Sequence, residues 1–239
     1  MLLLVAAPFT LDVSGFVLTA ALLFAAIGVF FPALVTLLTF ASNERLGPSV
    51  TGTVSSTAPL FALAAAVLIL GERIPPRALV ATLGVVAGVA LLSWRGGATL
   101  GRALWLPLLG AALRGLVQVV AKAGLALWPS PFAASLIGYS VSSVTVLAVN
   151  RRASHQRARV ARSARLWFMA TGLLNGAAVL LMYGALSAAP VSLVAPVVAG
   201  YPLVTVILGS ALLREERLSV RIASGALLIV AAIAYLVAA

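Results

Sequence analysis

The stretch ILGERIPPR at residues 69–77 places Glu72, Arg73 and Arg77 in a chain that is 63% hydrophobic and only 9% charged. A similar charged stretch, LLREERLSVR, follows at residues 212–221. Each stretch lies between two long apolar runs, where charged side chains can reach a membrane surface at little cost. The two stretches therefore predict polar turns between pairs of apolar helices.

The apolar runs are too long and too numerous for the core of a soluble protein of 239 residues, and the mean hydropathy is +1.17. A helix needs about 20 apolar residues to cross a bilayer. Runs of about that length can be drawn at 16–41, 48–70, 77–94, 103–127, 131–149, 166–188, 190–213 and 218–238. The sequence therefore predicts an all-α, polytopic membrane bundle of about eight transmembrane helices.

The two charged stretches align with each other, and so do their upstream flanks. The pair Glu72-Arg73 aligns with Glu216-Arg217, and Pro59 aligns with Pro202. Chance similarity between helices rich in Ala and Leu is the alternative explanation, so only the prolines and the Glu-Arg pairs carry weight. We interpret the matches as an internal duplication.

The duplication predicts an incomplete first copy of about three helices at residues 1–97 and a second copy of about five helices at residues 98–239. Equivalent helices of the two copies are five membrane crossings apart. Because five is odd, the copies must enter the bilayer from opposite sides. This inverted-topology repeat is typical of secondary transporters, in which a midplane site opens alternately to each side.

The charged stretch in each copy is expected to be the polar hairpin between the last two helices of that copy. We expect its carboxylate to cap a helix or to form an ion pair within the hairpin. The alternative is that Glu72 or Glu216 takes part in coupling transport to an ion.

At these residues the chain resembles the EamA-domain members of the drug/metabolite transporter superfamily. The shared pattern is a proline near the start of a helix, a Gly-Glu-Arg or Glu-Glu-Arg hairpin about thirteen residues later, and then small residues seven apart, here Ala81/Gly88 and Gly225/Ala232. The resemblance implies ten helices in two inverted repeats of five. It therefore implies that the first two helices are missing here, with residues 1–8 as a remnant of an earlier helix.

The basic residues predict an orientation in the membrane. If all eight runs span, most of the 16 basic residues lie in connections that share one side, and the opposite connections hold only Arg73 and Arg77. By the positive-inside rule the Arg-rich side is cytoplasmic. The net charge of +11 then reflects membrane orientation, and no nucleic-acid partner is expected.

The helix expected at 103–127 carries the most informative polar residues, because Arg114, Gln118 and Lys122 recur every four residues. An α-helix turns only about 40° past a full turn in four residues, so the three side chains share a face. A cation near the middle of a span costs at least about 2.5 kcal/mol, and no acid lies within a predicted helix core to compensate Arg114. Either Arg114 donates to carbonyls or tyrosines inside the bundle, or it lines a wet cavity and meets an anionic substrate group. Lys122 is close enough to the helix end to reach the headgroups.

The other candidate substrate-binding residues are polar side chains within apolar runs, where they are expected to face protein or a cavity: Asn175, Tyr183, Tyr201 and Ser56. Pro59 and Pro202 are expected to kink their helices and to serve as hinges. The glycine pairs Gly84/Gly88 and Gly172/Gly176, four residues apart, are expected at close helix contacts.

The sequence offers little for catalysis. It contains no Cys and one His, His155, so neither a usual metal site nor a catalytic triad can be built. No phosphate-binding glycine loop is present. No catalytic residue, metal or cofactor is therefore predicted, and the chain is not expected to be an enzyme.

Together with the resemblance, these features predict a secondary transporter, and an exporter, of small metabolites such as amino acids or organic acids by alternating access. The alternative is a non-transporting or truncated membrane protein that acts as an assembly subunit. The expected partners are a small-molecule substrate and the lipid bilayer, and a homo-oligomer is left open. The excess of Arg over Lys and the abundant Ala favour a multi-pass protein of a bacterial inner membrane.

Overall fold

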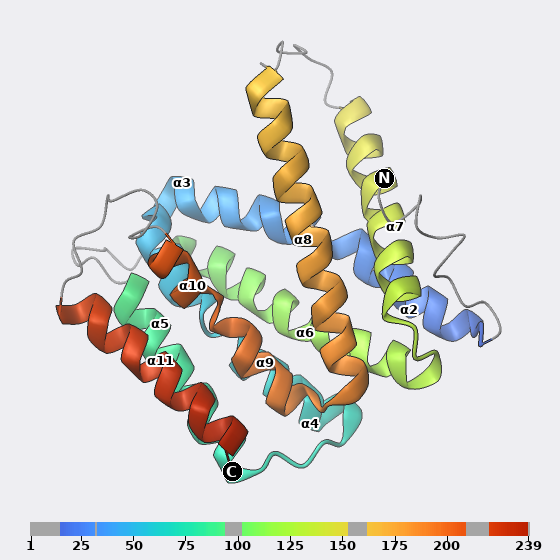
Figure 1. The fold of residues 1–239 in the computed structure, drawn as a ribbon. Coiled ribbons are helices and arrows are strands. Elements are labelled where there is room, and N and C mark those ends of the chain that lie inside the picture. Colours follow the sequence, from blue (N-terminus) through green and yellow to red (C-terminus); the bar gives the residue numbers. More distant parts are fainter. Residues whose placement is uncertain (1–14, 32, 94–101, 153–161, 209–219, 239) are drawn as a thin grey trace. The chain divides into compact units, whose positions relative to one another are not determined.

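The computed structural model describes residues 15–31, 33–93, 102–152, 162–208 and 220–238, and every regular element in these ranges is helical (Figure 1). The prediction of an all-α chain is therefore confirmed. The helices are α2 (Leu18–Phe30), α3 (Ala33–Ser55), α4 (Ala58–Leu70), α5 (Pro76–Ser93), the 3-10 turn η1 (Arg102–Leu104), α6 (Trp105–Leu127), α7 (Pro131–Arg152), α8 (Arg162–Ala188), α9 (Val191–Ala199), α10 (Tyr201–Leu208) and α11 (Val220–Ala238).

Within the described part of the chain, six helical stretches are long and apolar enough to cross a membrane. They are Leu18–Gly47, Val50–Leu70, Trp105–Leu127, Pro131–Ala148, Ala164–Ala188 and Val220–Ala238. Two further apolar stretches, Pro76–Leu92 and Val191–Val204, are shorter. Each of the eight predicted runs thus contains one or more helices in its described part.

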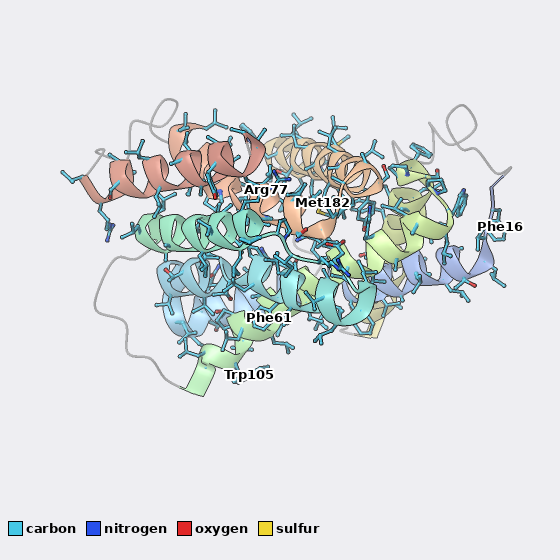
Figure 2. The ribbon with its side chains drawn as sticks, turned by 90° about the horizontal axis from the view of Figure 1, so that it is seen from below. Phe16, Phe61, Arg77, Trp105 and Met182 are labelled. Carbon is cyan, nitrogen blue, oxygen red and sulfur yellow. The ribbon has the colours of Figure 1, made fainter. Side chains whose placement is uncertain are left out.

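Many large apolar side chains of these helices are exposed, among them Phe61 and Trp105, which Figure 2 labels. Leu68 is 85% exposed and Trp167 is 75% exposed. Such residues would be costly in water. They fit a chain whose outer helix faces contact lipid.

The helices form two compact units. One contains residues 1–34 and 120–188, and the other contains residues 35–119 and 189–239. Each unit therefore combines segments from both predicted sequence copies, 1–97 and 98–239. The predicted copies describe a duplication of the sequence, whereas the units describe contacts in the structure. The copies therefore stay a prediction.

In the second unit, α5 and α11 pack side by side through small residues (Figure 1). A Cβ added to Gly84 would lie 2.8 Å from the Cβ of Ala232, and one added to Gly88 would lie 2.8 Å from the carbonyl oxygen of Gly225. As the residue number rises along α5, the number of the residue that it contacts on α11 falls. The two helices are therefore antiparallel. This is the arrangement that two oppositely threaded copies would give, and Gly84 and Gly88 are confirmed as close-packing positions.

The hairpin between α4 and α5 contains the charged stretch of the first copy. Gly71 ends α4 in the left-handed region at φ 65°, which glycine adopts without steric cost. The amide of Glu72 donates to the Ala66 carbonyl at 3.1 Å, which satisfies a terminal carbonyl of α4. The predicted position of the hairpin is confirmed.

The carboxylate of Glu72 caps a helix, but the helix is distant in sequence. Its Oε1 accepts from the Val191 amide at 3.0 Å and its Oε2 accepts from the Ser192 amide at 3.2 Å. These amides lie in the first turn of α9, where they have no partner within the helix and where the helix dipole favours an anion. The expectation of a helix cap is therefore confirmed, but its expected place within the hairpin is wrong, because the amides at the start of α9 offer the carboxylate two charge-assisted bonds. Glu215, Glu216 and Arg217 of the second stretch, and residues 1–8, lie outside the described residues.

Both predicted spans that contain the aligned prolines are interrupted directly before the proline. In the first span, α3 ends at Ser55 and α4 begins at Ala58, with Pro59 as the second residue of α4. In the second span, α9 ends at Ala199 and α10 begins at Tyr201, with Pro202 as the second residue of α10. Proline lacks an N–H and is favoured in the first turn of a helix. Both restarted helices place their proline there, whereas Pro196 lies inside α9 without ending it.

In the first unit, α2 packs against α7, and α8 contacts α7. Phe24 is fully buried, and the Phe16 ring meets the Trp128 ring edge to face with centroids 5.4 Å apart. Nothing within the described chain lies within 4 Å of a Cβ added to Gly172 or Gly176 of α8. The expectation of close packing at this pair is therefore wrong, because residues 165–175 of α8 are exposed on every side.

Candidate functional site

The guanidinium of Arg114 is held by one hydroxyl. Arg114 lies near the middle of α6 and is half-buried. Its Nη2 donates to Oγ1 of Thr39 on α3 at 3.1 Å. The Thr39 hydroxyl in turn donates to the Val35 carbonyl one turn earlier, at 2.8 Å. Because the Thr39 proton is committed to Val35, the oxygen presents a lone pair to the guanidinium and fixes its position.

Most of the donor capacity of Arg114 stays open. A guanidinium carries five N–H donors and no acceptor. In the described part of the chain, Thr39 supplies the one hydrogen bond to Arg114, no carboxylate pairs with it, and its Nε is buried without a partner. The arrangement can therefore donate hydrogen bonds to an anionic group, which would also compensate the charge.

Gln118 lies one turn further along the same face of α6. Its side chain is 7% exposed, and its Oε1 is buried without a hydrogen-bond partner among the described residues. Buried polar atoms in folded proteins are nearly always paired with protein or water. Gln118 thus adds an open acceptor beside the open donor of Arg114.

Lys122, the third residue of the face, is satisfied by the protein. Its Nζ donates to the Leu186 carbonyl at 2.7 Å, in the last turn of α8. Carbonyls of a last turn have no partner in the helix, and a cation is favourable there. The ammonium of Lys122 therefore holds the end of α8, a contact that the sequence did not predict.

A small cleft lies within the first unit, between α2, α7 and α8. Its empty volume is about 220 Å³, including space open to the outside, and it is lined by Ile27, Phe31, Ser135, Gly138, Tyr139, Val179 and Tyr183. The Ser135 hydroxyl is buried without a partner among the described residues. The Tyr139 hydroxyl donates to the Asn175 carbonyl at 3.3 Å. The cleft is thus mostly apolar, with hydroxyl-bearing residues on α7 and α8.

The remaining predicted residues lie on α8, at the break before α4 and at the start of α10. Tyr183 is buried and lines the cleft, whereas the Asn175 side chain, two turns earlier on α8, is exposed. The Ser56 hydroxyl donates to the Thr53 carbonyl at 2.6 Å, at the break before α4. Tyr201 is 58% exposed at the start of α10. Of the predicted set, only Arg114 and Gln118 are brought together with open polar atoms.

Two residues of these sites were not predicted from the sequence. Thr39 and Ser135 are small polar residues in long apolar runs, and they resemble the many Ser and Thr side chains that bond their own helix. The Thr39 hydroxyl also bonds its own helix, so the sequence around it does not indicate the second hydrogen bond, from Arg114. Among the described residues, no group of three or more His, Asp or Glu side chains is close enough to hold a metal ion.

Comparison with known proteins gives one family match and matches to solved structures. The sequence profile of the EamA-like transporter family matches the chain twice, at residues 1–94 and 101–238. One protein crystal structure is similar with a TM-score of 0.73 and 18% identity, covering 88% of this chain and 74% of the other. At that identity the likeness shows the fold alone. No curated protein matches the sequence.

Proposed function

Because this chain belongs to the EamA-like transporter family of the drug/metabolite transporter superfamily, we propose that it is a secondary carrier of small anionic or zwitterionic metabolites. Membership of this family of multi-pass membrane proteins supports transport rather than enzyme chemistry. The proposal adds the substrate class, an export direction, and a bacterial inner membrane as its location.

The observation that carries the proposal is the uncompensated guanidinium of Arg114 in the middle of a span. A cation at such a depth is costly and marks a functional site when protein does not neutralise it. Thr39 contributes one neutral hydrogen bond, and no described carboxylate contributes charge. A carboxylate of a substrate would supply the missing negative charge and up to two parallel hydrogen bonds.

The mechanism we propose is alternating access between two copies threaded in opposite senses, residues 1–97 and 98–239. The helix breaks before Pro59 and Pro202 support it, because broken helices accompany substrate sites in such carriers. The two prolines would act as hinges at equivalent points of the two copies. Asn175 and Tyr183 in the first unit, and Ser56 and Tyr201 in the second, stay candidates for contact with the substrate.

The experiment is substrate counterflow in proteoliposomes containing purified protein and a panel of labelled amino and organic acids. We expect saturable counterflow of at least one acid. Arg114→Ala should weaken its apparent affinity about 10- to 150-fold, because a hydrogen bond to a charged group contributes about 1.5–3 kcal/mol. Arg114→Lys should retain part of the affinity, since the charge remains but the fork geometry is lost.

Lys122→Ala is the matched control, because it removes a neighbouring cation that is bonded to a carbonyl rather than open. Its effect on apparent affinity should be much smaller than that of Arg114→Ala. Absence of counterflow across the whole panel, with folded protein, would reject the proposal. It would favour the alternative of a non-transporting assembly subunit.

A further inference from the structure

In the first unit, α7 and α8 are in contact near one end and exposed near the other. The Tyr139 hydroxyl of α7 donates to the Asn175 carbonyl of α8, and beyond this bond the two helices continue as separate rods (Figure 1). Residues 165–175 of α8 are exposed on every side, and Val146 of α7 is 47% exposed. Nothing in the described part of the chain covers α8 there.

The exposed segments carry the same helix faces that line the cleft at the closed end. Two turns of an α-helix take about 7.2 residues, so positions seven apart share a face. Gly172 and Arg165 lie seven and fourteen residues before Val179, which is buried and lines the cleft. On α7, Val146 lies seven residues after Tyr139, which also lines the cleft. We refer to the exposed faces at Val146, Arg165 and Gly172 as the α7–α8 surface.

The open end of the α7–α8 surface is strongly basic. Helix α7 ends at Arg151-Arg152, α8 begins at Arg162, and Arg165 is exposed in the first turn of α8. The sequence contains no acidic residue at positions 73–214. Among the described residues, no hydrogen bond or ion pair involves Arg165. The described chain therefore leaves this positive charge without compensation.

The exposed segment of α8 is as long as one leaflet of the bilayer is deep. Ten residues separate Arg165 from Asn175, which corresponds to about 15 Å along a helix. The hydrocarbon core of a bilayer is about 30 Å thick, so each leaflet contributes about 15 Å. An acyl chain that starts at the arginines would therefore end where the Tyr139 hydroxyl joins α7 to α8.

We propose that an anionic phospholipid binds the α7–α8 surface, with its phosphate at the arginines and its acyl chains along Val146 and Gly172. Basic segments at the cytoplasmic end of a transmembrane helix attract anionic lipids, and the arginines predict that this end is cytoplasmic. Nothing described lies within 4 Å of a Cβ added to Gly172, so a chain can lie against the helix backbone there. A second copy of the protein fits this surface less well, because its arginines would face these arginines. The inference does not depend on the proposed substrate.

The test is photolabelling of the purified full chain in detergent, with a phosphatidylglycerol that carries a diazirine in one acyl chain. Mass spectrometry of the digested protein then locates the adducts. We expect adducts concentrated at residues 143–148 and 165–175. Unlabelled dioleoylphosphatidylglycerol should displace the label at a concentration about 10-fold or more below that of dioleoylphosphatidylcholine, because only the first lipid has a net negative charge. Glycerol 3-phosphate, which has the phosphate but no acyl chain, should not compete.

The arginines are tested by replacement with glutamine. Arg165→Gln should weaken competition by dioleoylphosphatidylglycerol about 5-fold, and joint replacement of Arg151, Arg152 and Arg165 should weaken it about 100-fold, since the contributions of basic residues near anionic lipid add. The control is Arg73→Gln, which removes an exposed arginine from the hairpin between α4 and α5. It should leave the competition unchanged.

The position of the acyl chain is tested by a bulky side chain on α8. Gly172→Leu should weaken labelling about 10-fold, because the leucine occupies the place of the chain. Gly184→Leu is the matched control, since Gly184 also has nothing described within 4 Å of an added Cβ. It lies five residues after Val179 and therefore on another face of α8. Labelling of this variant should equal that of the wild type.

Wild-type protein alone decides the question if a variant does not fold. Equal competition by the two phospholipids, or adducts spread evenly over all exposed helices, would overturn the inference. Competition by glycerol 3-phosphate would also overturn it, because a free phosphate site would then explain the arginines. Since the chain contains no Cys, a disulfide-linked dimer of Gly172→Cys in membranes would show that a second copy covers the surface instead.

Discussion

At the scale of single residues, the hydroxyl of Thr39 decides how the cation of Arg114 is presented. It accepts from Nη2 and donates to its own helix, so the guanidinium is fixed before any ligand arrives. A preorganised donor loses less entropy on binding than a mobile one. The position of Arg114 therefore depends on a residue that need not touch the substrate.

Thr39→Val keeps the shape of the side chain but removes this acceptor. We expect the apparent KM for the counterflow substrate to rise about 5- to 30-fold, because loss of this hydrogen bond costs about 1–2 kcal/mol. Thr39→Ser, which restores the hydroxyl, should return most of the affinity. An unchanged KM for Thr39→Val would show that Arg114 does not need this contact.

Glu72 is the second residue with a testable role, as the cap of α9. Glu72→Gln removes the charge and turns an NH₂ group toward one of the two amides, so we expect a loss of about 1–2 kcal/mol in unfolding free energy. The measurement is denaturant unfolding in detergent, with the exposed neighbour change Arg73→Gln as the control. If Glu72 instead couples transport to protons, Glu72→Gln would abolish proton-driven uptake and leave stability unchanged.

At the scale of elements, the same glycine spacing meets two different environments. Gly88 of α5 faces the Gly225 carbonyl and the Ile229 side chain of α11, whereas Gly172 of α8 has open space within the described chain. Gly88→Ala should destabilise the protein by about 1–3 kcal/mol through overpacking. Gly172→Ala should be neutral, or stabilising by up to about 1 kcal/mol through helix propensity.

The two alanine variants form a matched pair, because both replace a glycine inside an apolar helix. Their unfolding midpoints in the same detergent provide the comparison. A midpoint for Gly88→Ala at or above that of Gly172→Ala would contradict the close approach of α5 and α11.

This pair also shows how far sequence reasoning reaches. Hydropathy predicted every helical run, because the bilayer sets both the length and the apolar character of a span. The two aligned prolines predicted where two spans break, because proline restrains the backbone directly before it, although Pro196 lies inside α9 without a break. Which glycine lies at a helix interface depends on the partner helix. The pairs that contain Gly88 and Gly172 have the same spacing, so spacing alone cannot predict which pair lies at an interface. For the same reason Arg114 and Gln118 could be predicted as candidates, but the bond between Arg114 and Thr39, 75 residues apart, could not.

At the scale of the whole molecule, the inverted repeat makes a prediction about sidedness. The hairpin at Arg73 and its equivalent at Arg217 should lie on opposite sides of the membrane, with Arg73 outside and Arg217 in the cytoplasm. Because the chain contains no Cys, Arg73→Cys and Arg217→Cys each introduce a unique thiol. A membrane-impermeant maleimide added to intact cells should label the first variant and not the second.

Permeabilised cells provide the control, since both thiols should react once the membrane is open. Labelling of both variants from outside, or of neither, would reject the opposite threading of the two copies. Labelling of Arg217→Cys alone would keep the inverted repeat and reverse the orientation expected from the arginines.

The bond between Glu72 and the start of α9 also has a consequence for biosynthesis. The carboxylate and its nearer amide partner are 119 residues apart, and ribosomes add about 5–20 residues per second. After the hairpin has been made, about 6 to 24 s pass before the nascent chain contains Val191. During that interval the early helices wait in the translocation machinery or the lipid without their later partner. A chaperone or insertase that shelters them then would contribute to yield without changing the finished protein.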